Sequence, residues 1–254
     1  MNALIRYVYL SMIYTFFYLP ILVLIIYSFN HSAYSMVWHG FSFQWYRELI
    51  HDTDMQVIAL HSLIVGVLAA TIATTIGTLA SVALYRYKFY GKQLLRSLIF
   101  ILIVSPDIVM GIALLILFSS LKISLGFWTL LLSHITFCIP FVVVTVYSRM
   151  VGFDRNIFEA ARDLGASDFH IFRQIFVPML LPAIIAGWLL SFTLSLDDVI
   201  ISYFVTGPDF QILPLQIFSM VRLGVTPEVN ALCSAMFILT LIIVFSAQLA
   251  LRKK

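Results

Sequence analysis

Long apolar stretches without charge alternate along the chain with short polar segments. Four stretches contain no Asp, Glu, Lys or Arg: Tyr7–Tyr46, Met55–Tyr85, Ile123–Ser148 and Val229–Leu251. About 20 consecutive apolar residues are enough for a helix to cross the hydrocarbon core of a bilayer. The stretches do not alternate apolar and polar residues, as the strands of a transmembrane barrel would. The pattern therefore predicts an all-α integral membrane protein.

Six transmembrane helices account for these stretches and for the apolar runs between them. The expected spans are Val8–Ser28, Ala59–Tyr85, Ser97–Ser119, Leu125–Tyr147, Met179–Thr206 and Ala231–Leu251. Composition agrees, because 62% of the 254 residues are hydrophobic and 11% are charged, whereas a soluble domain is about 25% charged. We expect the first span to be a membrane helix and not a cleaved signal peptide, since no small-residue cleavage site closes it.

Basic residues are distributed unevenly among the loops that join these spans. One set of loops holds 12 of the 15 basic residues and the other set holds 3. The larger set is Arg6, Arg86, Lys88, Lys92, Arg96, Arg149, Arg155, Arg162, Arg173, Arg252, Lys253 and Lys254. The smaller set is Arg47, Lys122 and Arg222. Loops rich in Lys and Arg stay in the cytoplasm, so both termini are expected there.

A polar, amphipathic segment at residues 150–178 interrupts the apolar pattern on the predicted cytoplasmic side. Ile157, Ala161 and Leu164 recur at helical spacing and form one apolar stripe. Gly165 is suited to the end of that helix, where glycine adopts a left-handed conformation at low cost. The stripe either packs on the ends of the chain's own membrane helices or docks into a groove of a soluble partner.

A second short helix is expected after Ser167, which is a suitable N-cap residue. Phe169, Phe172 and Phe176 would form its apolar face. Pro178, followed by Pro182, is expected to break or kink the path into the fifth membrane helix.

The spacing of this segment resembles the EAA motif of ABC importer permeases. Glu159-Ala160-Ala161 is followed after three residues by Gly165, after nine more by Ile175, and then by Val177-Pro178, where the family usually has Leu-Pro. In that family the loop inserts into a cleft of the ATP-binding subunit. The coupling residues that the resemblance implies are Glu159, Ala160, Ala161, Asp163, Gly165, Phe169, Ile175 and Pro178.

The resemblance implies the six-helix type I, or MetI-like, permease architecture in a bacterial inner membrane. Residues 1–55 would then form the first transmembrane helix and an outer loop with a short amphipathic helix, and residues 56–251 the permease core. The coupling loop at 150–178 lies within that core, and residues 252–254 form a cytoplasmic tail. The implied partners are two copies of an ATP-binding subunit, a second homologous permease subunit and a periplasmic binding protein.

Further segments are similar to the permeases of polyamine importers, which transport spermidine and putrescine. They are residues 84–89, 105–110, 133–138, 163–167, 196–199 and 219–221. The resemblance thus implies a polyamine permease working by alternating access. A type I permease for another organic cation, an amino acid, a phosphonate or ferric ion is the alternative.

Three acids, Asp107, Asp197 and Asp198, fall inside the third and fifth predicted spans. A carboxylate at bilayer depth is costly and is by default a functional hypothesis. A polycation needs carboxylates in place of water, and aromatic faces add cation–π attraction. Aromatic residues near the acids in sequence are Trp188, Tyr203 and Phe204. Alternatively, an acid here caps a helix break or bonds a partner subunit.

Neighbouring residues on a helix point about 100° apart. One acid of the pair Asp197 and Asp198 is therefore expected to face the substrate path, and the other a neighbouring helix. His134, inside the fourth span, is either a proton relay or a hydrogen-bonded packing residue, and the second role is favoured.

The sequence lacks the Gly-x-x-x-x-Gly-Lys-Ser/Thr phosphate-binding motif, since Gly91-Lys92 has no upstream glycine at the required spacing. ATP hydrolysis must therefore come from partner subunits, and no enzyme activity is expected of this chain. No cofactor, metal site or nucleic-acid contact is predicted. A secondary transporter and a membrane-embedded enzyme remain as other classes, but no inverted repeat and no nucleophile–base pair supports either.

Overall fold

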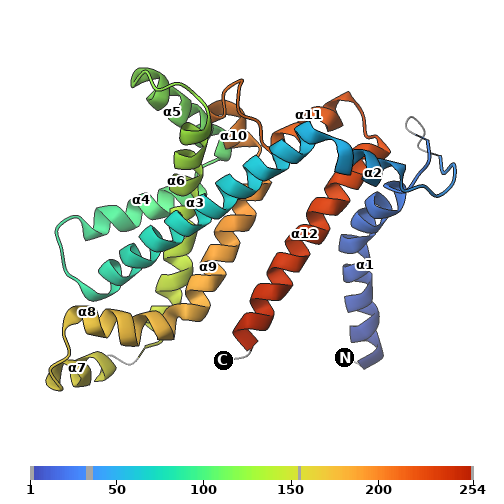
Figure 1. Cartoon of the computed structure of the whole chain (residues 1–254). Coiled ribbons are helices and arrows are strands. Elements are labelled where there is room, and N and C mark those ends of the chain that lie inside the picture. The colour runs from blue at the N-terminus through green and yellow to red at the C-terminus, as the bar shows by residue number, and fades with distance from the viewer. Residues whose placement is uncertain (1–2, 33–36, 154–155, 253–254) are drawn as a thin grey trace. The chain divides into compact units, whose positions relative to one another are not determined.

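The computed structural model describes residues 3–32, 37–153 and 156–252 (Figure 1). In chain order its helices are α1 (Ala3–Tyr27), α2 (Gln44–His51), α3 (Thr53–Arg86), α4 (Lys92–Val104), α5 (Asp107–Ser120), α6 (Phe127–Val151), α7 (Asn156–Asp163), α8 (Asp168–Ile171), the π-helix η1 (Phe172–Phe176), α9 (Val177–Asp197), α10 (Ile200–Val205), α11 (Leu213–Leu223) and α12 (Pro227–Arg252). Over the described residues, β structure is limited to one isolated bridge between Asn30 and Phe41. The predicted tail at 252–254 begins at the last residue of α12, and Lys253 and Lys254 lie outside the described residues.

Five helical runs of the described chain are long and apolar enough to cross a membrane, and there are six if α4 and α5 count as one broken span. The five are Ile5–Tyr27, Thr53–Arg86, Phe127–Val151, Asp168–Asp197 and Pro227–Ser246. The predicted fold class is confirmed: the chain is an all-α membrane protein, and the sixth span is the bent pair.

The third predicted span, Ser97–Ser119, is wrong as a single helix. The chain turns by 114° between α4 and α5, and both Ser105 and Pro106 have extended backbone conformations. Proline lacks a backbone N–H and disfavours helical geometry at the residue before it. Pro106 therefore ends α4 at Val104, and α5 starts afresh at Asp107.

The prolines after the coupling segment do not break the helix, so the predicted break is wrong, whereas a kink there stays a prediction. Pro178 lies in the first turn of α9 and Pro182 lies inside it, yet the helical run continues from Asp168 to Asp197. The π-helix η1 comes directly before them, and the N–H of Val177 bonds to the carbonyl of Phe172, five residues back. This wider turn gives the ring of Pro178 room that a regular α-turn would deny it.

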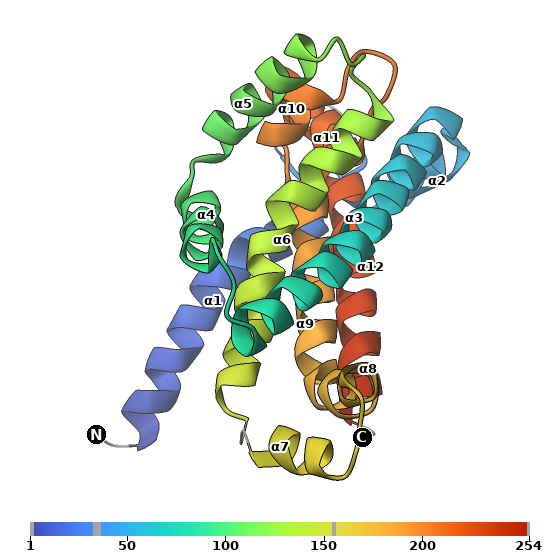
Figure 2. The same ribbon diagram turned by 90° about the vertical axis from the view of Figure 1, so that its left-hand side faces the viewer.

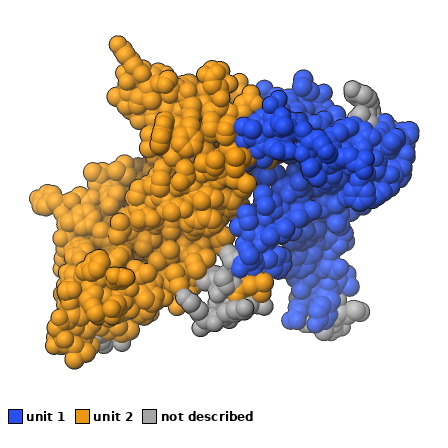
Figure 3. Space-filling model, in the orientation of Figure 1, with its two compact units in different colours: residues 1–59, 215–246 blue, residues 60–214, 247–254 orange. Residues whose placement is uncertain are grey.

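The chain divides into two compact units (Figure 3). The first comprises residues 1–59 and 215–246, and the second residues 60–214 and 247–254. In the first unit the indole N–H of Trp45 donates to the carbonyl of Asn30 at 2.7 Å, and the ring is 7% exposed. Ser28 and Tyr46 share a hydrogen bond of 2.7 Å. Trp45 thus holds the outer loop together as a packing residue.

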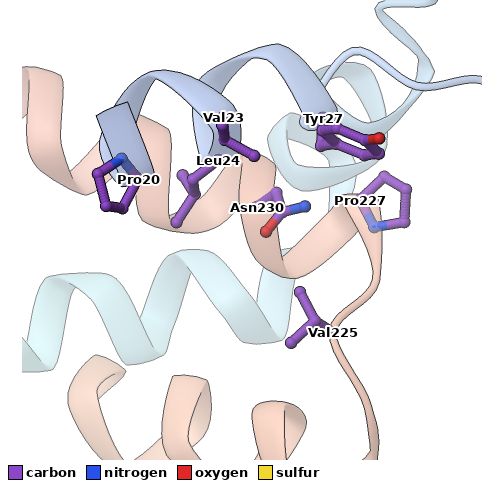
Figure 4. Close-up of a pocket in the computed structure, with 7 residues that line it drawn as sticks. All are labelled: Pro20, Val23, Leu24, Tyr27, Val225, Pro227 and Asn230. Atoms are coloured by element: carbon purple, nitrogen blue, oxygen red, sulfur yellow. The ribbon is translucent and has the colours of Figure 1, made fainter. Parts of the chain in front are cut away.

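A hollow of about 520 Å³ in the first unit lies between α1 and the beginning of α12 (Figure 4). Its walls are mostly apolar, and Asn230 is buried beside it. None of the seven residues that line it is charged. The lining of this hollow therefore offers no carboxylate to a cation.

The second unit is built on α6, which lies beside α9 (Figures 1 and 2). The sequence is rich in small residues along α3, and the structure uses them for close packing. A Cβ on Gly77 would come within 2.7 Å of Val142 of α6, and Gly187 of α9 approaches the same valine. However, α6 is the most enclosed span, with 61% of its apolar window buried against 39% for α3.

Candidate functional site

The coupling segment begins with α7, which ends in a Schellman turn. The N–H of Ala166 bonds to the carbonyl of Ala161 at 3.0 Å, and the N–H of Gly165 bonds to that of Arg162 at 2.8 Å. These are the two hydrogen bonds that define this helix ending. Gly165 has φ +83°, a left-handed conformation that favours glycine. The glycine of the motif is therefore explained by the backbone of this turn.

One side of the coupling segment packs onto the membrane helices of the second unit. Ile171 and Phe176 are fully buried there, and Ala161, Ala166 and Ile175 pack against the same cluster. The cluster is completed by Val82, Val142, Val146, Met150 and Leu180 from α3, α6 and α9. The segment is thus held to the chain's own core, but of the predicted apolar stripe only Ala161 packs there, whereas Ile157 and Leu164 are exposed.

The other side of the coupling segment is left uncovered. The side chains of Leu164 and Phe169 are 88% and 69% exposed, and Glu159, Ala160 and Asp163 are exposed beside them. Exposed apolar side chains at this density are typical of an interaction surface. The segment therefore also has the uncovered face that docking to a partner requires, and we call these five residues the docking surface.

The three phenylalanines of the expected apolar face do not share one environment, since Phe169 is 69% exposed. The buried positions are Ile171 and Phe176, with Phe172 partly buried, because the turn at Ser167 and the π-helix set the rotation of this run. Ser167 caps α8 as predicted, and its Oγ accepts from the N–H of His170 at 3.3 Å. Pro178 is exposed at the start of α9.

An ionic clasp ties the coupling segment to the end of α3. The carboxylate of Asp168 is ion-paired with Arg86 of α3, and it also contacts Arg162 of α7 at 3.2 Å. No local pattern in the sequence indicates this clasp, since Arg86 and Asp168 are 82 positions apart.

Asp198 stands at a break between α9 and α10, where its own backbone is extended. Its carboxylate accepts from the N–H groups of Ile201 at 3.2 Å and Ser202 at 2.8 Å, and from the Ser202 hydroxyl at 2.7 Å. The side chain thereby caps the first turn of α10 in the manner of an N-cap residue. The single predicted helix Met179–Thr206 is therefore wrong, because this cap starts a new helix.

His134 of α6 completes the network around Asp198. Its side chain is 1% exposed, and its Nε2 lies 3.4 Å from the Asp198 carboxylate. Its Nδ1 contacts the Ser195 hydroxyl at 2.6 Å and its Nε2 the Ser202 hydroxyl at 2.9 Å. The imidazole thus bridges α6, α9 and α10, which is the packing role favoured from the sequence.

The other residues predicted to line the substrate path either are exposed or contact side chains of the same chain. Asp107, Asp197 and Tyr203 are exposed, whereas Asp198 is 8% exposed. The two neighbouring acids thus lie in different environments: the carboxylate of Asp198 packs inside the chain and that of Asp197 is exposed, while the role of Asp197 in a substrate path stays a prediction. The helices that begin at Asp107 and just after Asp198, α5 and α10, pack against each other.

Trp188 is engaged within the chain. Its indole N–H donates to the Thr71 hydroxyl at 3.0 Å, and its ring stacks on Phe192 with centroids 5.3 Å apart. Phe204 packs over Gly111, where an added Cβ would lie 2.7 Å from the phenyl ring. These two aromatic residues hold α3 to α9 and α5 to α10 respectively.

The described residues contain no group of three or more His, Cys, Asp or Glu side chains that could hold a metal ion. Cys138 and Cys233 are free.

Comparison with known sequences is informative at this point. Residues 73–254 match the family described as "Binding-protein-dependent transport system inner membrane component". The chain is 54% identical to the spermidine/putrescine transport system permease protein PotC of Escherichia coli (strain K12), covering 100% of this chain and 96% of that protein. It is 51% identical to PotC of Haemophilus influenzae, over 98% and 96% of the two chains. It is 46% identical to the putrescine transport system permease protein PotI of E. coli (strain K12), over 90% and 84%.

Solved structures share the fold at low sequence identity. A bacterial ABC transporter involved in the import of the acidic polysaccharide alginate superposes with a TM-score of 0.78 at 17% identity, covering 96% of this chain and 94% of that chain. A chain of the MetNI methionine ABC transporter gives 0.65 at 16% identity, covering 80% and 98%. At these identities the likeness concerns the fold alone.

Proposed function

Because the chain belongs to the binding-protein-dependent transport system inner membrane component family, we propose that its importer carries polyamines such as spermidine and putrescine. The chain is a multi-pass permease subunit of an ABC importer and not an enzyme, as the sequence predicted, and ATP hydrolysis belongs to separate subunits. The observation that carries the substrate assignment is 54% identity over the full chain to a permease named for spermidine and putrescine.

The family implies ATP-binding subunits and a substrate-binding protein. We propose that one ATP-binding subunit docks on the exposed residues Glu159, Leu164 and Phe169 of the docking surface, and that a second copy docks on a partner permease. A coupling segment that is buried on one side and uncovered on the other suits this task. The buried side transmits a movement to α3, α6 and α9, while the uncovered side receives it.

A second, homologous permease is proposed to complete the path. Asp107 and Asp197 are exposed on this chain, although both lie in apolar, membrane-crossing stretches. Carboxylates at bilayer depth face water or protein and not lipid. A partner permease that covers α5 and the end of α9 would enclose both acids in a shared, water-filled path.

Both termini and the coupling segment are proposed to face the cytoplasm. The support is the 12-to-3 distribution of basic residues among the loops. ATP is available on that side, which the docking surface must therefore share. The loaded binding protein would then approach from the opposite side, where the loop between α1 and α3 lies.

Transport by alternating access follows from these parts. Closure of the ATP-binding subunits would move the coupling segment and, through its buried side, the membrane helices. The path would open outward, accept the polyamine against Asp107, Asp197 and Tyr203, and return inward after hydrolysis. In this arrangement Asp198 and His134 maintain the break that presents Asp197, whereas direct contact of Asp198 with substrate stays a prediction.

The test is uptake of labelled spermidine and putrescine by vesicles that contain the whole importer with its binding protein. ATP hydrolysis is followed in the same samples. Asp197→Asn is expected to lower uptake at least tenfold while binding-protein-stimulated hydrolysis persists. Asp54→Asn, an exposed acid in the first turn of α3, is the matched control and should transport normally. Absence of polyamine uptake in the unmodified importer would remove the substrate assignment.

A further inference from the structure

A basic hollow of about 330 Å³ lies where the end of α3 and the turn after it face α7. Its charged lining consists of Arg86, Lys88, Lys92 and Arg162, with Glu159 as the single acid among the lining residues. The proposed function uses these four cations only for the orientation of the chain and gives them no ligand. A hollow with this lining suits an anion that accepts several hydrogen bonds.

Two of the four cations are already partly neutralised. Arg86 and Arg162 both contact Asp168 in the ionic clasp. The ammonium of Lys92 donates to the carbonyl of Tyr87 at 2.9 Å, and it keeps two further N–H donors. Lys88 is exposed. The two lysines are therefore the groups best placed to bind an incoming anion.

A second, apolar groove of about 240 Å³ lies next to the basic hollow. Its apolar lining comes from Leu84, Ile99, Phe100, Ile103, Val143 and Val144 of α3, α4 and α6. Tyr147 lines this groove and Tyr85 lines the basic hollow, and their rings meet edge to face with centroids 6.4 Å apart. The two spaces thus share the Tyr85–Tyr147 wall.

The turn beside the hollow has the composition of a membrane–water interface. Tyr87, Phe89 and Tyr90 are exposed in the five residues that separate α3 from α4. Immediately beyond, α4 exposes Leu94 and other apolar side chains. Aromatic and lysine side chains at the end of an apolar helix are typical of headgroup depth. This composition suits headgroup depth, which is the level of phospholipid phosphates.

We propose that the basic hollow binds the phosphate of an anionic phospholipid, with one acyl chain lying in the groove beyond the Tyr85–Tyr147 wall. The hollow alone would suit any phosphate, but only a lipid also requires an adjoining apolar groove. The bound headgroup would contact both the turn after α3 and Arg162 of α7. It would therefore hold the coupling segment at a fixed height on the membrane, a role separate from substrate recognition.

The experiment is native mass spectrometry of the whole importer released from nanodiscs of phosphatidylglycerol and phosphatidylcholine. Lys88→Gln and Lys92→Gln are each expected to lower the retention of phosphatidylglycerol by about fivefold, the usual effect of one lysine near anionic lipid. Arg6→Gln serves as the control, because Arg6 is also a cation at the end of an apolar helix but lies outside the hollow. It should retain the lipid.

A second pair of variants separates a lipid from free phosphate. Val144→Trp fills the groove from an exposed position, whereas Leu94→Trp adds the same ring on the exposed surface of α4 away from it. Of the two variants, only Val144→Trp should reduce lipid retention. Inorganic phosphate offers the same charge-assisted hydrogen bonds as the headgroup but has no acyl chain, so an excess of about tenfold over lipid should not displace the lipid.

Three results would overturn the proposal. Equal lipid retention in Lys88→Gln, Lys92→Gln and the unmodified importer would show that the hollow holds no headgroup. Displacement by inorganic phosphate, with no effect of Val144→Trp, would assign it to a soluble anion. Cross-linking of position 88 to an ATP-binding subunit and not to lipid would assign it to the protein partner. None of these results depends on whether the importer carries polyamines.

Discussion

Replacing Asp198 by alanine removes an acceptor that three donors share. The donors are the N–H of Ile201, the N–H of Ser202 and the Ser202 hydroxyl. At about 0.6 kcal/mol for each polar interaction in a membrane protein, their loss costs about 2 kcal/mol. At about 1.5 kcal/mol for each bond to a charged group, it costs about 4.5 kcal/mol. The expected destabilisation lies between these limits, because the site is buried but within a membrane.

The assay is thermal unfolding of the purified importer, followed by intrinsic fluorescence. A loss of this size should lower the Tm of the permease by roughly 4 to 18 °C. Asp197→Ala is the matched control, since it removes the neighbouring acid from an exposed position and should shift stability by about 0.5 kcal/mol or less. Asp198→Asn should fall between the two, because the amide keeps one oxygen for the N–H groups.

Equal Tm values for Asp198→Ala and Asp197→Ala would refute this reasoning. That result would mean that the network around Asp198 and His134 contributes nothing to stability. A direct role of Asp198 in substrate binding would then become the better explanation for any loss of uptake. A lower Tm together with normal uptake would instead confine Asp198 to the helix break.

Three further predictions concern packing and coupling. Gly77→Val should destabilise the permease by about 1 to 3 kcal/mol in a thermal shift assay, because the new Cβ would lie 2.7 Å from Val142. Gly165→Ala should cost about 1 kcal/mol in the turn, since φ is +83°; uptake should fall while the Tm of the permease changes by less than in Gly77→Val. Glu159→Lys should abolish co-purification of the ATP-binding subunits, and normal recruitment with normal uptake would contradict the docking assignment.

The spans and the coupling segment could be predicted because their signals are local. A charge-free apolar run must be buried in lipid, and the spacing around Glu159 and Gly165 belongs to one short stretch of chain. The turn at Gly165 could likewise be anticipated, since glycine at a helix end has a known backbone reason. These features need no knowledge of what packs against them.

The predictions from sequence were wrong or incomplete where a contact between distant residues or a detail of the backbone determines the structure. A proline such as Pro106 permits an irregularity in a helix, but only the structure shows that the chain turns by 114° there. The sequence leaves Asp198 as either a substrate ligand or a helix cap, and only the structure shows that its carboxylate contacts His134 and Ser202. Phe169 points outward because the turn capped by Ser167 sets the rotation of α8, and the π-helix that follows, which leaves no clear mark in sequence, brings Phe176 inward.

The helical run from Asp168 to Asp197 is continuous, so a movement at one end displaces the other. Its 30 residues, at about 1.5 Å each, span about 45 Å, roughly the thickness of a whole bilayer. One end carries the clasp residue Asp168 beside the docking surface, and the other ends at the exposed Asp197. A tilt of about 5° about one end of a rod of this length displaces the other by about 4 Å. A small rocking of the segment on its ATP-binding partner is thus sufficient to move a carboxylate across the width of an ammonium group.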